Sequence, residues 1–533
     1  MKEKALLVGI VLVMAGLASA NFFVAEQKEV NISMISQEYT IKAIKAKGHE
    51  HLLRVEGKEI KNAFRPIAKP MNIPVANTED TEYHPTIASS GTTLFAGYAY
   101  STSLLEQDIY MVLSTDGGQT FTPAGYWTVE GVEDYPSFDH WGGNTYYGTF
   151  MPDPNTPYTY LMRINDITDT ATWELVYYDW SSYGWYDMQA PTMACHNSQD
   201  PWEFGVIGFI ASTDYESAPC VSAPHMFFAD PTEQGAEGYA YISWWSYNNS
   251  AHATATIDKA TDMIYCAYDW YNETSATYNI LVWGRSYEDP LEGESWLYEI
   301  PSTFYAQYPA IAAHDGHVVV LCQSDEHINQ DIACFYSSDG GATWELSYVT
   351  NSPEDDLYPS AVVSGDKIIC TFVRNGDLYY TYSEDWGATW EEPIKLNDVD
   401  GSVASEWRTA GITESGAVWT DTRDGNADIY YNSFPVPVLT AEITGGFGVT
   451  VTVSNVGTAA AENVPWSIEL SGGLILMGGK KEGTITSLAP GESTTIKSGL
   501  ILGIGKTTIT ATVGGTSITA SGFLLGPFVL GVK

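Results

Sequence analysis

The chain contains few positively charged residues. Lys and Arg together number 24 against 66 Asp and Glu, so the formal net charge is −42 over 533 residues. The shortage is strongest between Ala76 and Pro435, where eight basic residues face 54 acidic ones, a formal charge of −46. A field of this sign repels nucleic acids and anionic surfaces. We therefore expect no nucleic-acid partner, although acidity alone does not name a ligand.

Long hydrophobic runs are also scarce. The run from Ala5 to Leu17 follows Met-Lys-Glu-Lys and precedes Ala18-Ser19-Ala20, the pattern of a secretory signal peptide. We expect residues 1–20 to be cleaved and the protein to be secreted or displayed at the cell surface. The alternative is an uncleaved anchor, but the run is shorter than the roughly 20 apolar residues that a bilayer requires. No other segment is predicted to span a membrane.

Cysteines are few, and the chain lacks a CxxC motif, which argues against a metal knuckle or haem attachment. Six cysteines in an exported chain permit up to three disulfides, and their pairing stays open. Cys322 and Cys334 are predicted on neighbouring strands of one hairpin, and Cys195 and Cys220 on either side of an insertion. Buried free thiols are the alternative for cysteines on apolar strands. The HExxH, GxSxG and phosphate-loop motifs are also absent.

A repeat of roughly 50 to 60 residues dominates the sequence. Each unit begins with an aromatic or polar residue, which is often followed by Pro, and continues into a short apolar strand. Two further β-rich runs follow, the last often beginning Asp-Ile-Tyr. The seven starts are Tyr83-His84-Pro85, Tyr135-Pro136, Gln189-Ala190-Pro191, His252-Ala253, Tyr308-Pro309, Tyr358-Pro359 and Trp407-Arg408. Such spacing predicts an all-β fold, a β-propeller of four-stranded blades, with seven blades favoured and six as the alternative.

Three units carry the pattern Ser-x-Asp-x-Gly-x-Thr-Trp/Phe, at 114–121, 337–344 and 383–390. Here the chain resembles the BNR or Asp-box repeats of sialidase-like β-propellers. We expect Asp116, Asp339 and Asp385 to be structural, bonding backbone amides in a tight turn while the aromatic residue is buried between sheets. The predicted propeller spans 69–435, after an N-terminal extension at 21–68. We expect its strand around Ile73 to close the last blade, which otherwise lacks a fourth strand.

From residue 436 to 533 the sequence changes to alternating segments rich in Gly, Thr, Ile and Val. The turn Leu488-Ala489-Pro490-Gly491-Glu492 resembles that of Ig-like, CARDB-type adhesion modules. The resemblance implies a small Ig-like β-sandwich. Its role is either that of a spacer or that of docking to a cell surface or partner through the apolar end at 523–532.

In a propeller, the starts of the first strands share one face with the loops that join strands two and three. The ligand-face candidates there are Tyr83, Asp134, Tyr135, Asp269, Tyr358 and Asp421. Exposed tryptophans could also stack on sugar rings, and the candidates are Trp141, Trp180, Trp185, Trp244, Trp245 and Trp270. The alternative is that these rings fill the space between sheets.

Three arginines, Arg374, Arg408 and Arg423, map to this face. The sialidase resemblance implies that three arginines bind a substrate carboxylate beside a Tyr nucleophile, because a guanidinium offers paired donors. The alternative is that each arginine pairs with a neighbouring carboxylate. No catalytic residue can be assigned from the sequence.

One loop offers oxygen ligands at close spacing, from Asp421, Asp424, Asn426 and Asp428. It could hold Ca²⁺, which takes six to eight oxygens, or form a plain Asp/Gly turn. The leading hypothesis for the chain is a glycan- or protein-recognising sialidase-like propeller. An exo-α-sialidase-type glycoside hydrolase and a structural envelope or matrix protein are the alternatives.

Overall fold

The computed structural model describes the strands at 30–34, 37–45 and 50–54 and residues 72–533, apart from short gaps at 104–105, 129–130, 154–155, 182–184, 197–203, 216–217, 230–235, 242–249, 287–294, 301–303, 435–438, 456–460, 490–491 and 515. Side chains at 30–54 and most of those at 204–241 lie outside this description. So do the expected signal peptide at 1–20, Cys220 and the tryptophan side chains at 185, 244 and 245. The chain divides into two compact units, Met1–Ser433 and Phe434–Lys533.

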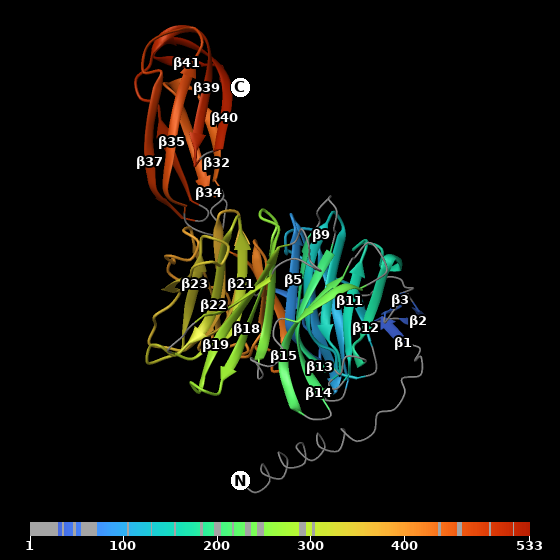
Figure 1. Ribbon diagram of the computed structural model, residues 1–533. Coiled ribbons are helices and arrows are strands. Elements are labelled where there is room, and N and C mark those ends of the chain that lie inside the picture. The colour runs from blue at the N-terminus through green and yellow to red at the C-terminus, as the bar shows by residue number, and fades with distance from the viewer. Residues whose placement is uncertain are drawn as a thin grey trace. The chain divides into compact units, whose positions relative to one another are not determined.

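Sheets with four antiparallel strands in sequential order build the first unit (Figure 1). The first three are β5 (Thr81–Ser90), β6 (Thr93–Ser103), β7 (Glu106–Ser114) and β8 (Thr122–Trp127); β9 (Asp134–Gly142), β10 (Thr145–Met151), β11 (Tyr158–Ile164) and β12 (Trp173–Asp179), with a 3₁₀ turn η2 (Thr170–Thr172) before β12; and β13 (Trp185–His196), β14 (Phe204–Tyr215), β15 (Ala218–Ala229) and β16 (Ala236–Tyr241).

The order continues in β17 (Ser250–Asp258), β18 (Met263–Asn272), β19 (Thr277–Ser286) and β20 (Ser295–Ile300); in β21 (Ala306–His314), β22 (His317–Ser324), β23 (Asp331–Ser337) and β24 (Glu345–Tyr348); in β25 (Asp356–Ser364), β26 (Lys367–Arg374), β27 (Asp377–Ser383) and β28 (Ile394–Lys395); and in β29 (Ala410–Ile412), β30 (Gly416–Asp421), β31 (Asp428–Ser433) and β4 (Ile73–Ala76).

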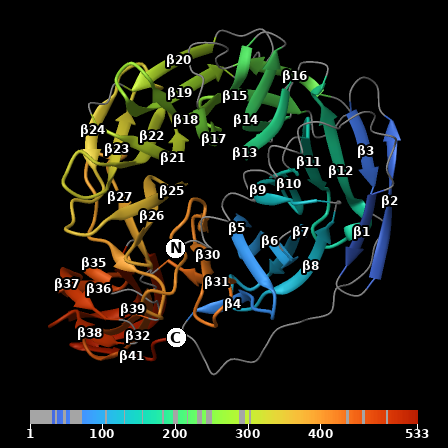
Figure 2. The same ribbon diagram turned by 90° about the horizontal axis from the view of Figure 1, so that it is seen from below.

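The sheets form a closed ring around a common axis, which Figure 2 shows end on. Each innermost strand contacts the next, from β5 through β9, β13, β17, β21 and β25 to β29, and β29 contacts β5. The last sheet is completed by β4, whose Ile73 lies opposite Tyr431 of β31. The fold is therefore an all-β propeller, and the prediction that the strand around Ile73 closes the last blade is confirmed.

Three strands from the N-terminal extension widen the second sheet. They are β1 (Val30–Met34), β2 (Gln37–Lys45) and β3 (Glu50–Arg54), and β3 pairs with the outer strand β12. The sheet order becomes β1-β2-β3-β12-β11-β10-β9. This part of the extension thus belongs to the propeller's outer edge.

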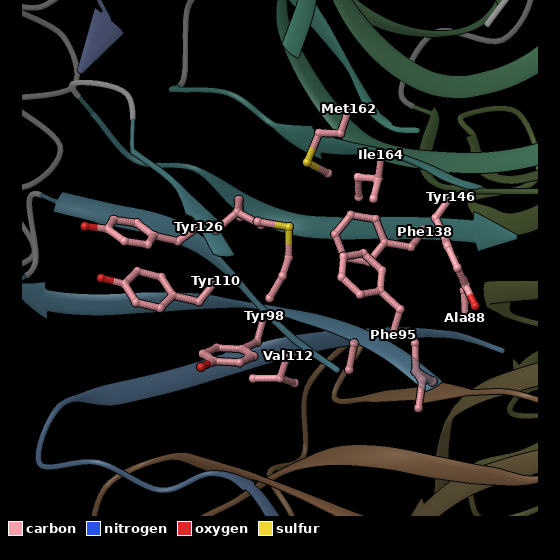
Figure 3. Close-up of a cluster of buried hydrophobic side chains, with 14 of the residues drawn as sticks. Ala88, Phe95, Tyr98, Tyr110, Val112, Tyr126, Phe138, Tyr146, Met162 and Ile164 are labelled. Carbon is pink, nitrogen blue, oxygen red and sulfur yellow. The ribbon is translucent and has the colours of Figure 1, made fainter. Parts of the chain in front are cut away.

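Large aromatic side chains fill the space between neighbouring sheets, as Figure 3 shows for the first two. The Phe138 ring lies 5.0 Å from that of Phe95. Gly97 and Gly148 make room for it, because a Cβ atom would meet the Phe138 ring at 2.3 Å and 2.1 Å, respectively. Tyr98 and Tyr110 pack in the same cluster. Since neighbouring sheets splay apart as they twist, bulky rings facing glycines are what fill the widening gap.

The three Asp turns have the same hydrogen bonds, here given for the first. Asp116 Oδ1 accepts the Thr120 N–H at 3.0 Å, and its Oδ2 accepts the Thr120 hydroxyl at 2.6 Å. Ser114 Oγ accepts the Gly118 N–H at 2.9 Å. Asp339 and Asp385 bond Thr343 and Thr389 in the same way. The expected amide contacts are thus present.

The aromatic residues that end these turns differ from the prediction in one respect. Phe121 is buried, but Trp344 and Trp390 are only partly buried, against the cores of the fifth and sixth sheets.

The five cysteines that the structure describes are buried free thiols, namely Cys195, Cys266, Cys322, Cys334 and Cys370. The hairpin expected around Cys322 and Cys334 exists, but these residues do not form a disulfide. Cys322 lies opposite Ala333, and Cys334 lies opposite Leu321, so the two thiols point to opposite faces of the sheet. They belong to different cores as a result.

The second unit consists of two antiparallel sheets around one core. One sheet contains β32 (Leu439–Thr444), β34 (Thr450–Asn455) and β38 (Ser493–Lys497). The other runs β33 (Gly446–Phe447), β41 (Phe528–Leu530), β40 (Thr516–Gly526), β39 (Leu502–Val513), β35 (Ala461–Ser471) and β37 (Lys480–Leu488), with β36 (Leu474–Met477) paired to β39. Val451, Ile468 and Ile509 meet in the core. Its Ig-like character stays a prediction.

In the described part of the chain, no helix has the length and apolarity needed to cross a bilayer.

Candidate functional site

The start of the innermost strand has the same unusual backbone in six sheets. A residue other than Gly adopts φ between +48° and +57° at this position, where L-residues are rarely found. In β5, β17, β21 and β25 the pairing register shifts across this residue, which marks a bulge. Bulges redirect side chains and are common beside functional sites. The residues are His84, Tyr135, His252, Tyr308, Tyr358 and Arg408.

Rings of these residues form one continuous chain around the axis. His84 stacks on Tyr135 with a centroid distance of 4.0 Å. Trp407 lies 5.2 Å from Tyr135 and 4.7 Å from His252. Since Trp407 precedes β29 while these partners belong to the second and fourth sheets, its indole crosses the axis. The chain continues from His252 to Tyr308 at 4.4 Å and from Tyr308 to Tyr358 at 4.9 Å.

Arg408 lies against this layer of rings and bonds the backbone of three other sheets. Its guanidinium donates to the carbonyl oxygens of Tyr135 at 3.4 Å, Pro191 at 2.7 Å and Ala253 at 3.2 Å. It also lies 4.6 Å from the Trp407 ring centroid. Burial lowers the pKa of Arg408 to about 10. The guanidinium thus holds the backbone of three sheets together.

Two histidines of the ring chain are each held by a buried carboxylate. His84 Nδ1 lies 2.7 Å from Asp134 Oδ1, which also accepts the Tyr135 N–H at 2.7 Å. His252 Nδ1 lies 2.7 Å from Asp269 Oδ2, which also accepts the Tyr308 N–H at 3.0 Å.

In each case a carboxylate joins an imidazole to the amide of a left-handed tyrosine. A carboxylate at Nδ1 fixes the tautomer with its lone pair on Nε2, the arrangement of a positioned proton acceptor. His84 Nε2 is 3.7 Å from Glu406, whose carboxylate is 44% exposed.

The face around these rings is acidic and partly open to solvent. Tyr83, Tyr135, His252, Tyr308, Tyr358 and Trp407 are all partly exposed. Burial raises the pKa of Tyr308 to about 12 and moves that of Tyr135 in the same direction, so both phenols stay protonated at neutral pH. On the same face, the loops 326–329 and 351–353 line a hollow of about 640 Å³.

Five of the six predicted ligand-face residues belong to this chain of rings or bond directly to it. Asp134, Tyr135, Asp269 and Tyr358 are described above, and the Tyr83 ring meets that of His84 edge-on at 4.9 Å. Asp421 does not belong to it. Its fully buried carboxylate accepts hydrogen bonds from Ser402 Oγ and Trp419 Nε1.

The three predicted arginines do not converge on a common ligand position. Arg374 forms a bidentate pair with buried Asp356, at 2.6 Å and 2.8 Å. Arg423 pairs in the same way with Asp421, at 2.8 Å and 2.7 Å, and also with Asp398 at 2.7 Å. These carboxylates raise the pKa of both arginines, although burial of Arg423 opposes the rise. The contacts of Arg374 and Arg423 match the ion-pair alternative, whereas Arg408 contacts backbone carbonyls instead of a carboxylate.

Side chains of the predicted calcium loop form hydrogen bonds with separate protein partners. Asp424 Oδ2 accepts from Asn77 Nδ2 and Tyr430 Oη, while Asn426 donates to backbone carbonyls of Thr78 and Asp80. Among the residues that the structure describes, no group of three or more His, Cys, Asp or Glu side chains is placed to hold a metal ion.

Two of the predicted sugar-stacking tryptophans are buried, Trp180 and Trp270, and Trp141 is partly buried. Tyr308, Trp407 and the two histidines are the ring-chain members that the ligand-face prediction missed. The signal for them was the repeat itself, because all four stand at or directly beside a unit start.

No protein-family model and no curated protein matches the chain. Solved structures of similar shape include an ulvan lyase of polysaccharide lyase family PL25, with 9% identity, a TM-score of 0.43 and coverage of 68% of this chain and 95% of that one. A Trypanosoma rangeli sialidase mutant with trans-sialidase activity has 12% identity, a TM-score of 0.37 and coverage of 89% and 88%. A thermostable family-43 glycoside hydrolase has 13% identity, a TM-score of 0.32 and coverage of 50% and 96%. At these identities and TM-scores, the similar structures assign no function to this chain.

Proposed function

We propose that this protein is an extracellular propeller that recognises a glycan through the axial cluster, defined as Tyr83, His84, Tyr135, His252, Tyr308, Tyr358 and Trp407. The observation that carries the proposal is a continuous chain of aromatic rings at or beside the strand starts, in which every ring except the buried His84 is partly exposed. Aromatic faces stack on the C–H groups of sugar rings, and phenol and imidazole edges supply hydrogen bonds to hydroxyls.

Charge decides which sugars fit. Arg374 and Arg423 are neutralised by bidentate carboxylates, and Arg408 is engaged by backbone carbonyls. Exposed carboxylates on this face include those of Glu354, Asp355 and Glu406. A carboxylated sugar would meet this field without a free guanidinium from the three arginines. We therefore propose a neutral or amino sugar as the ligand class rather than a sialoside.

Isothermal titration with three oligosaccharides tests this proposal, using a neutral cello-oligosaccharide, a cationic chitosan oligomer and anionic sialyllactose. We expect binding of the neutral or cationic sugar, weakened about tenfold by Tyr308→Ala or Trp407→Ala, since ring stacking contributes about 0.5–1.5 kcal/mol beyond area burial. Tyr298→Ala is the matched control, because Tyr298 is an exposed tyrosine of the outer strand β20. Equal affinity for wild type and both axial variants would refute the site.

A sialoside result would separate the alternatives. Hydrolysis of a fluorogenic sialoside by the wild type, lost in an Arg374→Ala, Arg408→Ala double variant that thermal unfolding shows to be folded, would establish the exo-sialidase alternative and displace the proposal. Self-association without any glycan binding would instead favour a matrix protein.

A second function is favoured by the two anchored histidines. The pairs Asp134–His84 and Asp269–His252 have the geometry of general acid–base groups at the sugar-binding face. If the bound glycan is also cleaved, we expect Asp134→Asn to lower kcat while KM changes little, because the variant disturbs the tautomer of His84 rather than the stacking surface. An unchanged kcat in Asp134→Asn and Asp269→Asn would exclude this role.

A further inference from the structure

The second unit carries an apolar sheet face that no part of its own core covers. Five large side chains lie directly opposite one another across five strands, and each is at least 47% exposed. Cross-strand partners point to the same face of a sheet, so they form one row. From β33 to β36 the row is Phe447, Phe528, Leu525, Ile504 and Leu474.

More apolar groups continue the row at the same end of the sheet. Leu530 and Phe523 are partners in the next row, and both are exposed. Leu476 and Met477 follow Leu474 in β36 and are exposed as well. The neighbouring residues of alternate parity, Leu524 and Val529, are buried in the core. The strands therefore have one face committed to the core and a second apolar face toward solvent, which is far from the usual pattern of antiparallel sheets.

Polar and charged residues follow the apolar row along the strands, with lysines nearest to it. Lys506 pairs with Phe523 in the second row, and the Lys533 backbone exchanges hydrogen bonds with Ser521 one row further. Beyond them the face is polar, with Thr508, Ser471 and Thr510. The first carboxylate on these strands is Glu469, opposite Thr510. The order along the strands is thus apolar, then cationic, then hydroxyl-bearing.

We propose that this face inserts into the surface of a lipid bilayer. Residues two apart on a strand are about 6.6 Å apart, so the lysines stand roughly 7–13 Å behind the apolar row. Interfacial segments bury their apolar groups about 5–10 Å into the boundary between headgroups and acyl chains. The two lysines then lie at the depth of the lipid phosphates, with which their charge is complementary, and the Thr and Ser residues remain in water.

A second copy of the chain fits this face less well. In a face-to-face pair, the apolar rows occupy only one end of the sheet, and the lysine row of each copy adds positive charge at the edge of the contact. A bilayer matches all three zones of the face, because acyl chains contact the apolar row, lipid phosphates the lysines, and water the hydroxyl groups. The inference uses residues separate from the axial cluster and does not depend on glycan binding.

Sedimentation of the full chain with phosphatidylcholine vesicles tests this inference, with and without 20 mol% phosphatidylglycerol. We expect wild type to sediment with the vesicles and an Ile504→Ser, Leu525→Ser variant to lose at least tenfold in partitioning. Leu346→Ser removes an exposed leucine from the propeller strand β24 and is the matched control, expected to bind like wild type.

Thermal unfolding verifies that each variant is folded, and sedimentation velocity reports self-association. Lys506→Ala is expected to weaken binding severalfold without changing the unfolding temperature. Absence of wild-type binding to both vesicle types would overturn the inference, as would a lipid-independent dimer that the Ile504→Ser, Leu525→Ser variant abolishes. Equal binding by wild type and that variant would overturn it too.

Discussion

Glu82 should make the propeller less stable as the pH rises, and Glu82→Gln should remove this dependence. Its side chain is fully buried in β5, where Oε1 accepts the Thr78 hydroxyl at 2.5 Å. Burial is the main cause that raises the pKa of Glu82 from 4.5 to about 8, and the nearby carboxylate of Asp428 adds to it. The carboxyl group is therefore protonated in the folded protein at neutral pH.

The sign of the effect follows from proton binding. In the unfolded chain Glu82 loses its proton near pH 4.5, whereas in the folded protein it keeps it to about pH 8. Between these values the folded state binds more protons, so the free energy of unfolding falls as the pH rises. The slope is about 1.4 kcal/mol per pH unit for one proton, which gives at most about 5 kcal/mol over the window. Below pH 4.5 the stabilisation is fully present.

Thermal unfolding of wild type and Glu82→Gln between pH 4 and 9 measures this effect. The amide keeps the shape of the protonated acid, with its oxygen toward Thr78 and its donors toward Asp428. We expect the variant to match wild type near pH 5 and to exceed it by several degrees at pH 9, at about 2–4 °C per kcal/mol or somewhat less for a unit of this size. Glu414→Gln, an exposed carboxyl group in the last sheet, controls for net charge. Parallel curves for wild type and Glu82→Gln would refute the reasoning.

Three further predictions concern stability and thiol chemistry. Arg374→Ala should lower the free energy of unfolding in urea by about 3–5 kcal/mol, because it leaves the buried Asp356 carboxylate without its two charged donors. Asp356→Asn in the same background replaces that carboxylate by a neutral amide and should recover part of the loss. Gly387→Ala should cost about 1–3 kcal/mol, since φ is +99° and the new Cβ would lie 2.8 Å from Cys334 Sγ, and a variant as stable as wild type would contradict the structure. A thiol reagent should label at most Cys220 in the native protein, because the other five thiols are buried and burial raises the pKa of Cys266 and Cys334 to about 12. In denaturant it should label all six cysteines. Fewer than six reactive thiols in denaturant would show a disulfide.

The strand repeat was predictable because it depends on local patterns. Apolar runs bounded by Gly, Asp and Pro mark strands and turns wherever they occur, so the unit starts and the closing strand around Ile73 could be found without tertiary information. The Asp turns were predictable for the same reason, since all four residues that make their hydrogen bonds lie within a few positions of one another.

The site was predictable only in part, because its chemistry depends on contacts between sheets. The sequence placed Arg374 on the correct face, yet its role follows from the register that sets Asp356 directly opposite it. The left-handed backbone at Tyr308 and Tyr358 had no local signal. A residue before Pro normally prefers an extended conformation, and here the packing of neighbouring sheets imposes a different one.

This strain itself supports a functional role for the axial cluster. A left-handed residue other than Gly costs about 1 kcal/mol or more, and glycine would remove that cost. In the sheet turns, where only a change of direction is required, left-handed positions are largely glycines, as at Gly91, Gly117 and Gly365. At the strand starts they are instead His, Tyr and Arg, whose side chains meet around the axis. Backbone strain alone would favour glycine at these positions. Arg408 is explained by its hydrogen bonds to three backbone carbonyls, whereas the tyrosine rings are better explained by what they present at the face than by the folding of the strands.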